Sequence, residues 1–129
     1  MKFEKKQIVC SAAPSPAGPY SQAITAGPFV FVAGQVPMNV ATGKKEGSIA
    51  DQTRTCIGNI KAILEQAGSS LGSIVKSNVY LSDIGDFGAM NEVYKEMIPS
   101  PCPARTTVAT MLRGILVEIE VIALLENYE

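Results

Sequence analysis

Segments with helical periodicity alternate with β-prone segments along this chain, and their order constrains the fold more than any other feature. Residues 48–68 place apolar side chains every three or four positions, between Ser48, which suits a helix N-cap, and Gly68, a typical helix stop. A second helical pattern covers 87–97 and ends before Pro99. Because an amphipathic helix buries one face against another layer, the order predicts an α+β sandwich with the helices on one face of a sheet.

Three segments are expected to supply most of that sheet. Residues 29–33 are aromatic and β-branched, and residues 74–81 alternate between apolar and polar side chains. Residues 104–125 are typical of a hairpin, with a two-residue turn at 113–114. A further strand is expected near Ile24. The predicted order is therefore strand, strand, helix, strand, helix and hairpin.

The hairpin has a consequence for three charged residues. With the turn at 113–114, side-chain alternation puts Arg105, Glu118 and Glu120 on one face of the sheet. Simple proximity in this register makes Glu120 the ion-pair partner of Arg105. One interpretation is a solvated sheet face with an ordinary salt bridge. The other is a guanidinium fork that holds a carboxylate beside a Glu that positions or activates water.

Composition excludes several classes of chemistry. The 129 residues include no histidine, which removes His-based catalysis and His-ligated metals. The three cysteines form no C-x-x-C motif and are expected to be free thiols. Lys plus Arg number 11 and Asp plus Glu 12, so the net charge of −1 favours neither nucleic acid nor an anionic membrane. We therefore expect no metal, no cofactor, no membrane and no nucleic-acid partner.

The balance of charged and apolar residues bears on assembly. Only 18% of the residues are charged, against about 25% in an average soluble domain, while 47% are hydrophobic. Either an oligomer covers part of the surface, or a monomer has a surface of small polar residues. The length of residues 1–129 is typical of one domain. The apolar runs are too short to span a bilayer, and the charged N-terminal segment does not resemble a signal peptide. We expect a single-domain intracellular protein.

Two short motifs are candidates for a ligand site. In Gly18-Pro19-Tyr20-Ser21-Gln22-Ala23, Tyr20 follows a rigid loop and is either a packing residue or a ligand contact. In Gly34-Gln35-Val36-Pro37, Gly34 either ends a strand or lets backbone N–H groups approach an oxyanion or carboxylate. Taken alone, neither motif decides between these interpretations.

Taken together, these segments and several others resemble the RidA family, also called YjgF/YER057c/UK114. The resemblance covers nearly the whole chain in the expected order. The segments that carry it are Gly-Pro-Tyr-Ser-Gln-Ala (18–23), Gly-Gln-Val-Pro (34–37), Asn-Ile-Lys-Ala-Ile-Leu-Glu-Gln-Ala-Gly (59–68), Ile-Val-Lys (74–76), Asp-Phe (86–87), Met-Asn-Glu-Val-Tyr (90–94), Pro-Ala-Arg (103–105) and Val-Glu-Ile-Glu (117–120).

The resemblance implies a fold and an activity. The fold is a chorismate-mutase-like mixed sheet with two helices on one face, assembled as a homotrimer with an inner barrel and clefts between subunits. The activity is that of a 2-iminobutanoate/2-iminopropanoate deaminase, which converts 2-imino acids to 2-oxo acids and ammonia without a cofactor, in the cytoplasm or the mitochondrial matrix. The alternatives are endoribonuclease or translation-inhibitor activity, and a non-catalytic small-acid-binding or chaperone-like trimer.

The resemblance also implies roles for particular residues. Arg105 would bind the substrate carboxylate, and Glu118 would orient the attacking water, with Glu120 as the alternative catalytic carboxylate. Many members have Ser before the Gly-Gln pair, where this chain has Ala33, and Cys two residues after the Arg, where it has Thr107. The loop 109–114 is also shortened relative to the family. The residues expected to bind substrate are Tyr20, Ala33, Gly34, Asn91 and Thr107.

Overall fold

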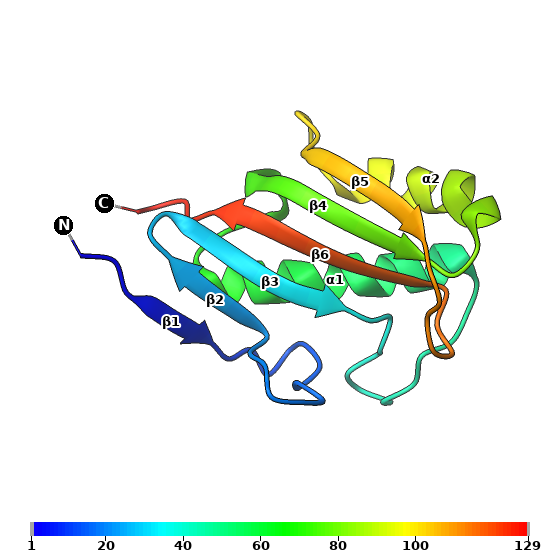
Figure 1. Cartoon of the computed structure of the whole chain (residues 1–129), viewed down its shortest axis with the longest axis horizontal. Helices are drawn as coiled ribbons and strands as arrows, with labels where there is room; N and C mark the ends of the chain where they lie inside the picture. The colour runs from blue at the N-terminus through cyan, green and yellow to red at the C-terminus, as the bar shows by residue number, and fades with distance from the viewer. Residues whose placement is uncertain (1, 129) are drawn as a thin grey trace.

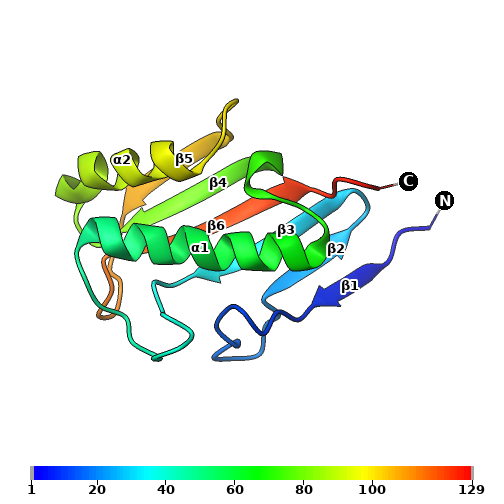
Figure 2. The ribbon, with the colours of Figure 1, turned by 180° about the vertical axis from the view of Figure 1, so that it is seen from behind.

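The structure, a computed structural model, describes residues 2–128. Within these residues, six strands form one sheet and two α-helices cover one of its faces (Figures 1 and 2). The strands are β1 (Lys5–Ile8), β2 (Ala23–Ala26), β3 (Phe29–Gln35), β4 (Ile74–Leu81), β5 (Ala104–Ala109) and β6 (Val117–Leu124), and the helices are α1 (Ile49–Ala67) and α2 (Phe87–Met97).

The sheet is mixed, with the strand order β1-β2-β3-β6-β4-β5. Only β4 and β5 pair in parallel, and the other neighbours are antiparallel. Both helices lie on the same side of the sheet, in front of it in Figure 2 and behind it in Figure 1. We call the opposite side the open face. Neither α-helix of the described chain is long and apolar enough to cross a membrane.

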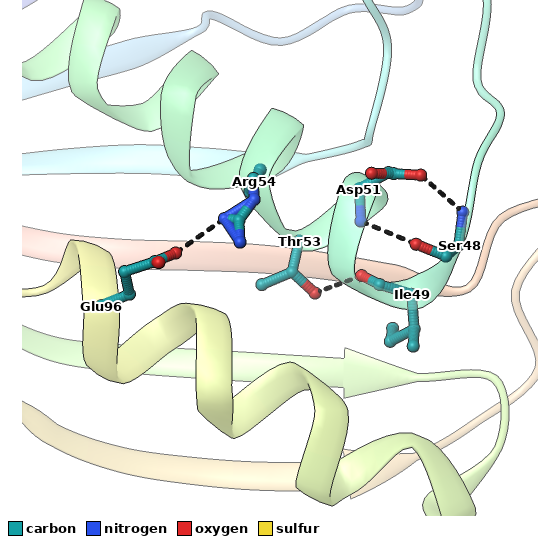
Figure 3. Close-up of polar contacts among 6 residues, drawn as sticks. All are labelled: Ser48, Ile49, Asp51, Thr53, Arg54 and Glu96. Carbon is teal, nitrogen blue, oxygen red and sulfur yellow. Dashed lines mark hydrogen bonds and ion pairs between the residues drawn. The ribbon is translucent and has the colours of Figure 1, made fainter.

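The α1 helix begins and ends as the sequence predicts. Ser48 Oγ accepts a hydrogen bond from the Asp51 amide at 3.1 Å, and the Asp51 carboxylate accepts one from the Ser48 amide at 3.1 Å (Figure 3). Gly68 ends the helix with a left-handed φ of 88°. Figure 3 also shows Arg54 of α1 paired with Glu96 of α2 at 2.7 Å, an exposed ion pair that contributes at most about 1 kcal/mol.

The hydrophobic core lies between the helices and the sheet. Side chains of β6 alternate, so every second residue is buried against α1 and the residues between them face the open side. Burial of each large apolar side chain stabilises the fold by roughly 1.5–3 kcal/mol. The core residues of these two elements are Cys56, Ile57, Ile60, Ile63, Leu64, Val117, Ile119, Val121 and Ala123.

The predicted hairpin is wrong. β4 lies between β5 and β6, so residues 104–109 never pair with residues 117–124. The parallel pairing of β4 with β5 needs a crossover connection, which α2 provides. Gly114 has the expected positive φ, at 67°, but it lies in a loop from 110 to 116. The sequence therefore indicates the turn residue correctly, but not the partner of the strand before it.

The observed register also separates the charged residues. Ser77 pairs with Arg105, and its hydroxyl shares a hydrogen bond with Tyr94 of α2, so Arg105 lies on the helix-covered side. Glu118 and Glu120 alternate with buried core residues and lie on the open face. The prediction that Arg105 shares a face with the two glutamates is therefore wrong, and the predicted ion pair between Arg105 and Glu120 does not form.

Candidate active site in two halves

The first cluster of candidate residues lies where β3 meets β6. Between Val32 and Gln35, β3 has one residue more than β6, which makes a β-bulge. The bulge brings the Cα of Gly34 against the carboxylate of Glu118 on β6. A Cβ atom on residue 34 would lie 3.1 Å from Glu118 Cδ and would overlap a carboxylate oxygen. Gly34 is therefore required for this close approach, because any larger residue would displace Glu118.

Glu118 is half-buried and electrostatically perturbed. Burial raises the pKa of its carboxyl group above the ordinary Glu value, and the nearby charge of Glu120 raises it further. In the described part of the chain its carboxylate accepts no hydrogen bond, whereas that of Glu120 accepts two. A carboxyl group with a raised pKa and unoccupied oxygens suits a residue that orients water and exchanges a proton with it.

Glu120 is held by the neighbouring strand. Its carboxylate accepts hydrogen bonds from Asn78 Nδ2 at 3.2 Å and from the Tyr80 hydroxyl. The bond to Glu120 raises the pKa of Tyr80, so that Tyr80 remains a protonated donor. Glu120 thus takes part in a network with β4, and this arrangement favours Glu118 as the carboxylate that is free to engage water.

The second cluster surrounds Arg105 on the other side of the sheet. The guanidinium carbon lies 4.7 Å from the ring centroid of Tyr94 and 5.6 Å from that of Phe87, both on α2. Tyr94 is buried, and its hydroxyl lies 3.0 Å from Ser77 Oγ on β4. No ion pair in the described chain engages Arg105. Stacking orients the guanidinium plane while its N–H groups stay available for an incoming carboxylate.

A cavity of about 450 Å³ adjoins Arg105. Asn91 of α2 lines it, as does Cys102, which is a free thiol as predicted and is exposed. Thr107 follows Arg105 by two residues on the same side of β5, and within residues 2–128 its buried hydroxyl has no hydrogen-bond partner. An unsatisfied buried hydroxyl costs about 1–3 kcal/mol. Of the predicted residues, Asn91 and Arg105 line this cavity, whereas Thr107 lies further along β5 and does not line it.

Tyr20 lies in the loop before β2, on the Gly34 side of the molecule. Its side chain is 52% exposed, and its hydroxyl oxygen accepts a hydrogen bond from the Ala17 amide at 3.1 Å. The Ala33 amide donates to the Gln22 carbonyl at 2.9 Å, which fixes this loop beside the bulge of β3. Tyr20 is thus an exposed aromatic residue two positions before Gln22, the residue that bonds to Ala33.

Sequence reasoning missed two buried glutamines that hold these loops. Gln22 Oε1 accepts from the Cys10 amide at 2.7 Å, and Gln22 Nε2 donates to the Cys10 and Pro14 carbonyls, each at 2.9 Å. Gln52 of α1 binds the backbone of two loops, at Gly47 just before α1 and at Leu116 just before β6. Gln22 belongs to the motif at 18–23, but neither glutamine signals a buried role in the sequence, because most glutamines are solvent-exposed.

The two clusters cannot serve one small molecule within a single chain. Glu118 and Gly34 belong to the open side, whereas Arg105 and Asn91 belong to the helix-covered side, with β4 between β6 and β5. Within residues 2–128 no group of three or more Cys, Asp or Glu side chains is arranged to hold a metal ion. The sheet therefore presents an arginine without an ion-pair partner on one side and a carboxyl group with a raised pKa on the other.

Comparison with known proteins shows where this fold occurs. The family model described as Endoribonuclease L-PSP matches residues 10–125. The 2-iminobutanoate/2-iminopropanoate deaminase of Dermatophagoides farinae is 41% identical over 125 residues, which cover 95% of this chain and 98% of that protein. Protein mmf1, mitochondrial, of Schizosaccharomyces pombe is 46% identical over 129 residues, which cover 95% of this chain and 78% of that protein.

A solved structure supports the same grouping. The crystal structure of E. coli TdcF with bound serine superposes with a TM-score of 0.88 at 37% sequence identity, over 92% of this chain and 98% of that one. The mixed sheet with two helices on one face is thus a fold shared with solved relatives. The chain belongs to the RidA (YjgF/YER057c/UK114) family, which confirms the resemblance seen in the sequence.

Proposed function

We propose that this protein hydrolyses 2-imino acids, or their enamine tautomers, to 2-oxo acids and ammonia. A water molecule adds to the imine carbon, and the carbinolamine that results expels ammonia as its C–N bond breaks and a carbonyl forms. The imine carbon is already electrophilic, so the protein has only to hold the substrate and place the water. Family membership and the deaminase relative support this class of reaction.

Arg105 is proposed to hold the substrate carboxylate through two parallel hydrogen bonds from its guanidinium group. The stacked and unpaired state of that group supports this role. Asn91 lines the cavity beside it, and Thr107, two residues along β5, is proposed to add a second polar contact. The serine in the TdcF structure is itself an amino acid with a carboxylate, which is consistent with a substrate of this class.

Glu118 is proposed to orient the attacking water and to take up its proton. Its raised pKa means that the carboxylate is a stronger base than an ordinary Glu and that its acid form can return the proton to the leaving nitrogen. Gly34 and Ala33 would line this side of the cleft, and Tyr20 would close it. Glu120 would act on Glu118 through its charge while remaining bound to β4.

The observation that carries this proposal is the placement of Arg105 and Glu118 on opposite sides of one sheet. The reaction needs both residues on the same substrate, so a second copy of the chain must bring its Arg105 cluster to the Glu118 cluster of the first. We infer a homotrimer with three such clefts and the sheets forming an inner, chorismate-mutase-like barrel. Residues 1–129 would act as one domain.

The open face of the sheet offers the surface for this assembly. Phe29, Phe31 and Leu124 are 38–42% exposed on neighbouring strands, and they lie on the face that no helix covers. Exposed apolar residues grouped in this way are typical of an interface between chains. Either the cytoplasm or the mitochondrial matrix would supply imine substrates, and the name of the fission-yeast relative favours the second.

An assay of 2-oxo acid release from freshly generated 2-iminopropanoate tests the proposal. We expect the wild-type protein to accelerate release and Arg105→Ala to abolish the acceleration. Incubation of the same preparations with RNA tests the endoribonuclease alternative that the family description suggests. Cleavage of RNA without 2-oxo acid release, or binding of 2-oxo acids without turnover, would overturn the hydrolase assignment.

A further inference from the structure

Gln52 connects helix α1 to the start of the strand that carries Glu118. It lies in the first turns of α1 and is 5% exposed. Its Oε1 accepts a hydrogen bond from the Leu116 amide at 2.8 Å, and its Nε2 donates to the Gly47 carbonyl at 3.0 Å. Leu116 is the last residue before β6 and precedes Glu118 by two positions. One side chain therefore joins the loop that enters α1 to the loop that enters β6.

Cys56 makes a second connection one helical turn further along the same face of α1. It is fully buried, and its thiol lies 3.3 Å from the Gln35 carbonyl and 3.7 Å from the Val117 carbonyl. Burial raises the pKa of this thiol, and the charge of Glu118 raises it further, so the sulfur keeps its proton and remains a donor. Gln35 follows Gly34 on β3, and Val117 precedes Glu118 on β6. The Cys56 thiol therefore contacts both strands next to the bulge.

We propose that Gln52, together with Cys56, is a positioning residue that holds the start of β6 so that the Glu118 carboxylate rests against the Cα of Gly34. The inference rests on the proposed function, because it assigns Glu118 its place in the reaction. The contact between Glu118 and Gly34 leaves no spare room, since even a Cβ on residue 34 would overlap the carboxylate. A small displacement of β6 would therefore change the position of Glu118 relative to the bulge.

The same arrangement makes the position of Glu118 independent of the loop that precedes it. Both backbone groups of Leu116 are engaged, the amide by Gln52 and the carbonyl by the Ser82 amide at 3.0 Å. The chain is thus fixed at the end of the 110–116 loop, whatever the length of that loop. This explains how the shortened loop still delivers the first Glu of the Glu-Ile-Glu run to Gly34.

Removal of the Gln52 amide leaves the Leu116 N–H without its partner and frees the start of β6. Glu118 then becomes more hydrated, and its pKa falls toward the ordinary Glu value. The titratable groups around it are Glu120 on β6, Tyr80 on β4 and Cys56 on α1, and β3 contributes none. These groups keep their places in the variant, so the shift reports the hydration of Glu118.

The test compares Gln52→Met with Ser69→Ala. Methionine keeps the shape of glutamine and removes both hydrogen bonds. Ser69 is 4% exposed, and its hydroxyl donates to the Leu124 carbonyl at 2.7 Å, so Ser69→Ala removes a hydrogen bond to the opposite end of β6. Cys56→Ala is the second variant if Gln52→Met does not fold, and it should shift Glu118 in the same direction by a smaller amount.

Two measurements are made on each folded variant: kcat and KM for 2-iminopropanoate over a range of pH, and NMR titration of the Glu118 carboxyl group. In Gln52→Met we expect kcat to fall by up to about 100-fold with little change in KM, because Arg105 still binds the carboxylate. The acidic limb of the kcat profile should move to lower pH together with the Glu118 titration. Ser69→Ala should leave both unchanged.

An unchanged Glu118 titration in folded Gln52→Met would overturn the positioning role, as would the same effects in Ser69→Ala. The titration also separates this inference from the proposed function. If wild-type protein releases no 2-oxo acid, the hydrolase assignment fails, while a shifted Glu118 titration in Gln52→Met still supports the positioning role.

Discussion

The substitution Gly34→Ala tests the candidate site at its tightest contact. Gly34 is not among the glycines with positive φ, so its backbone accepts an alanine without torsional strain. The added Cβ would instead meet the side chain of Glu118, at 3.1 Å from Cδ and 3.3 Å from Cγ, with overlap at a carboxylate oxygen. The only group that has to move is the carboxylate end of a flexible side chain.

The magnitudes follow from this geometry. Overpacking of a rigid core costs about 1–3 kcal/mol, and the mobility of the Glu118 side chain places this case at or below the lower end. In the proposed role, Glu118 acts as a general base, and its displacement would remove most of that contribution, which is typically about 100- to 10,000-fold. We therefore expect a folded protein with little turnover.

The assay measures 2-oxo acid release and urea unfolding on the same preparations. Gly58→Ala is the matched control, because Gly58 lies inside α1 and a Cβ added there would meet no neighbouring side chain within 4 Å. It should leave turnover unchanged and stabilise the protein by about 0.5–1 kcal/mol through helix propensity. Full turnover in Gly34→Ala would refute the reasoning, since Glu118 could not then act from its place against Gly34.

Four further predictions concern Arg105, the two glutamates and the assembly. Arg105→Lys should abolish most turnover with little change in stability, because an ammonium group cannot form two parallel hydrogen bonds to a carboxylate; full activity would reduce Arg105 to a structural role. Glu118→Gln should lower turnover and stabilise the protein at neutral pH. Folding raises the pKa of Glu118, so the folded wild-type protein loses stability as pH rises from below the ordinary Glu pKa through the raised value. Glutamine carries no charge and escapes this loss. Glu120→Gln should mainly lower stability, because the Glu120 carboxylate accepts hydrogen bonds from Asn78 and Tyr80. Urea unfolding and turnover are measured for both Gln variants. If the two variants show each other's expected effects, Glu120 is the working residue. Light scattering at micromolar concentration should give the mass of three chains, and the mass of one chain would contradict the proposed cleft between copies.

Local chemistry determined much of this protein. The capping box at Ser48, the stop at Gly68 and the alternation of residues 74–81 depend on neighbours within a few positions, so the sequence predicted these elements where the structure has them. The family motifs identified Arg105, Glu118 and Gly34 as candidates in the same way. Their roles in the reaction remain predictions that the experiments above test.

Only the tertiary structure decided which strands pair and which face each candidate residue occupies. The segment at 104–109 has the composition of a strand whether its partner is β6 or β4, because β-propensity does not specify a neighbour. The α2 crossover places β5 in parallel beside β4 at the edge of the sheet, and that single pairing sends Arg105 to the helix-covered side, away from Glu118. The contacts proposed to position Glu118 likewise include residues far apart in the chain, such as Gln52 and Leu116, 64 positions apart, and no local pattern encodes that contact.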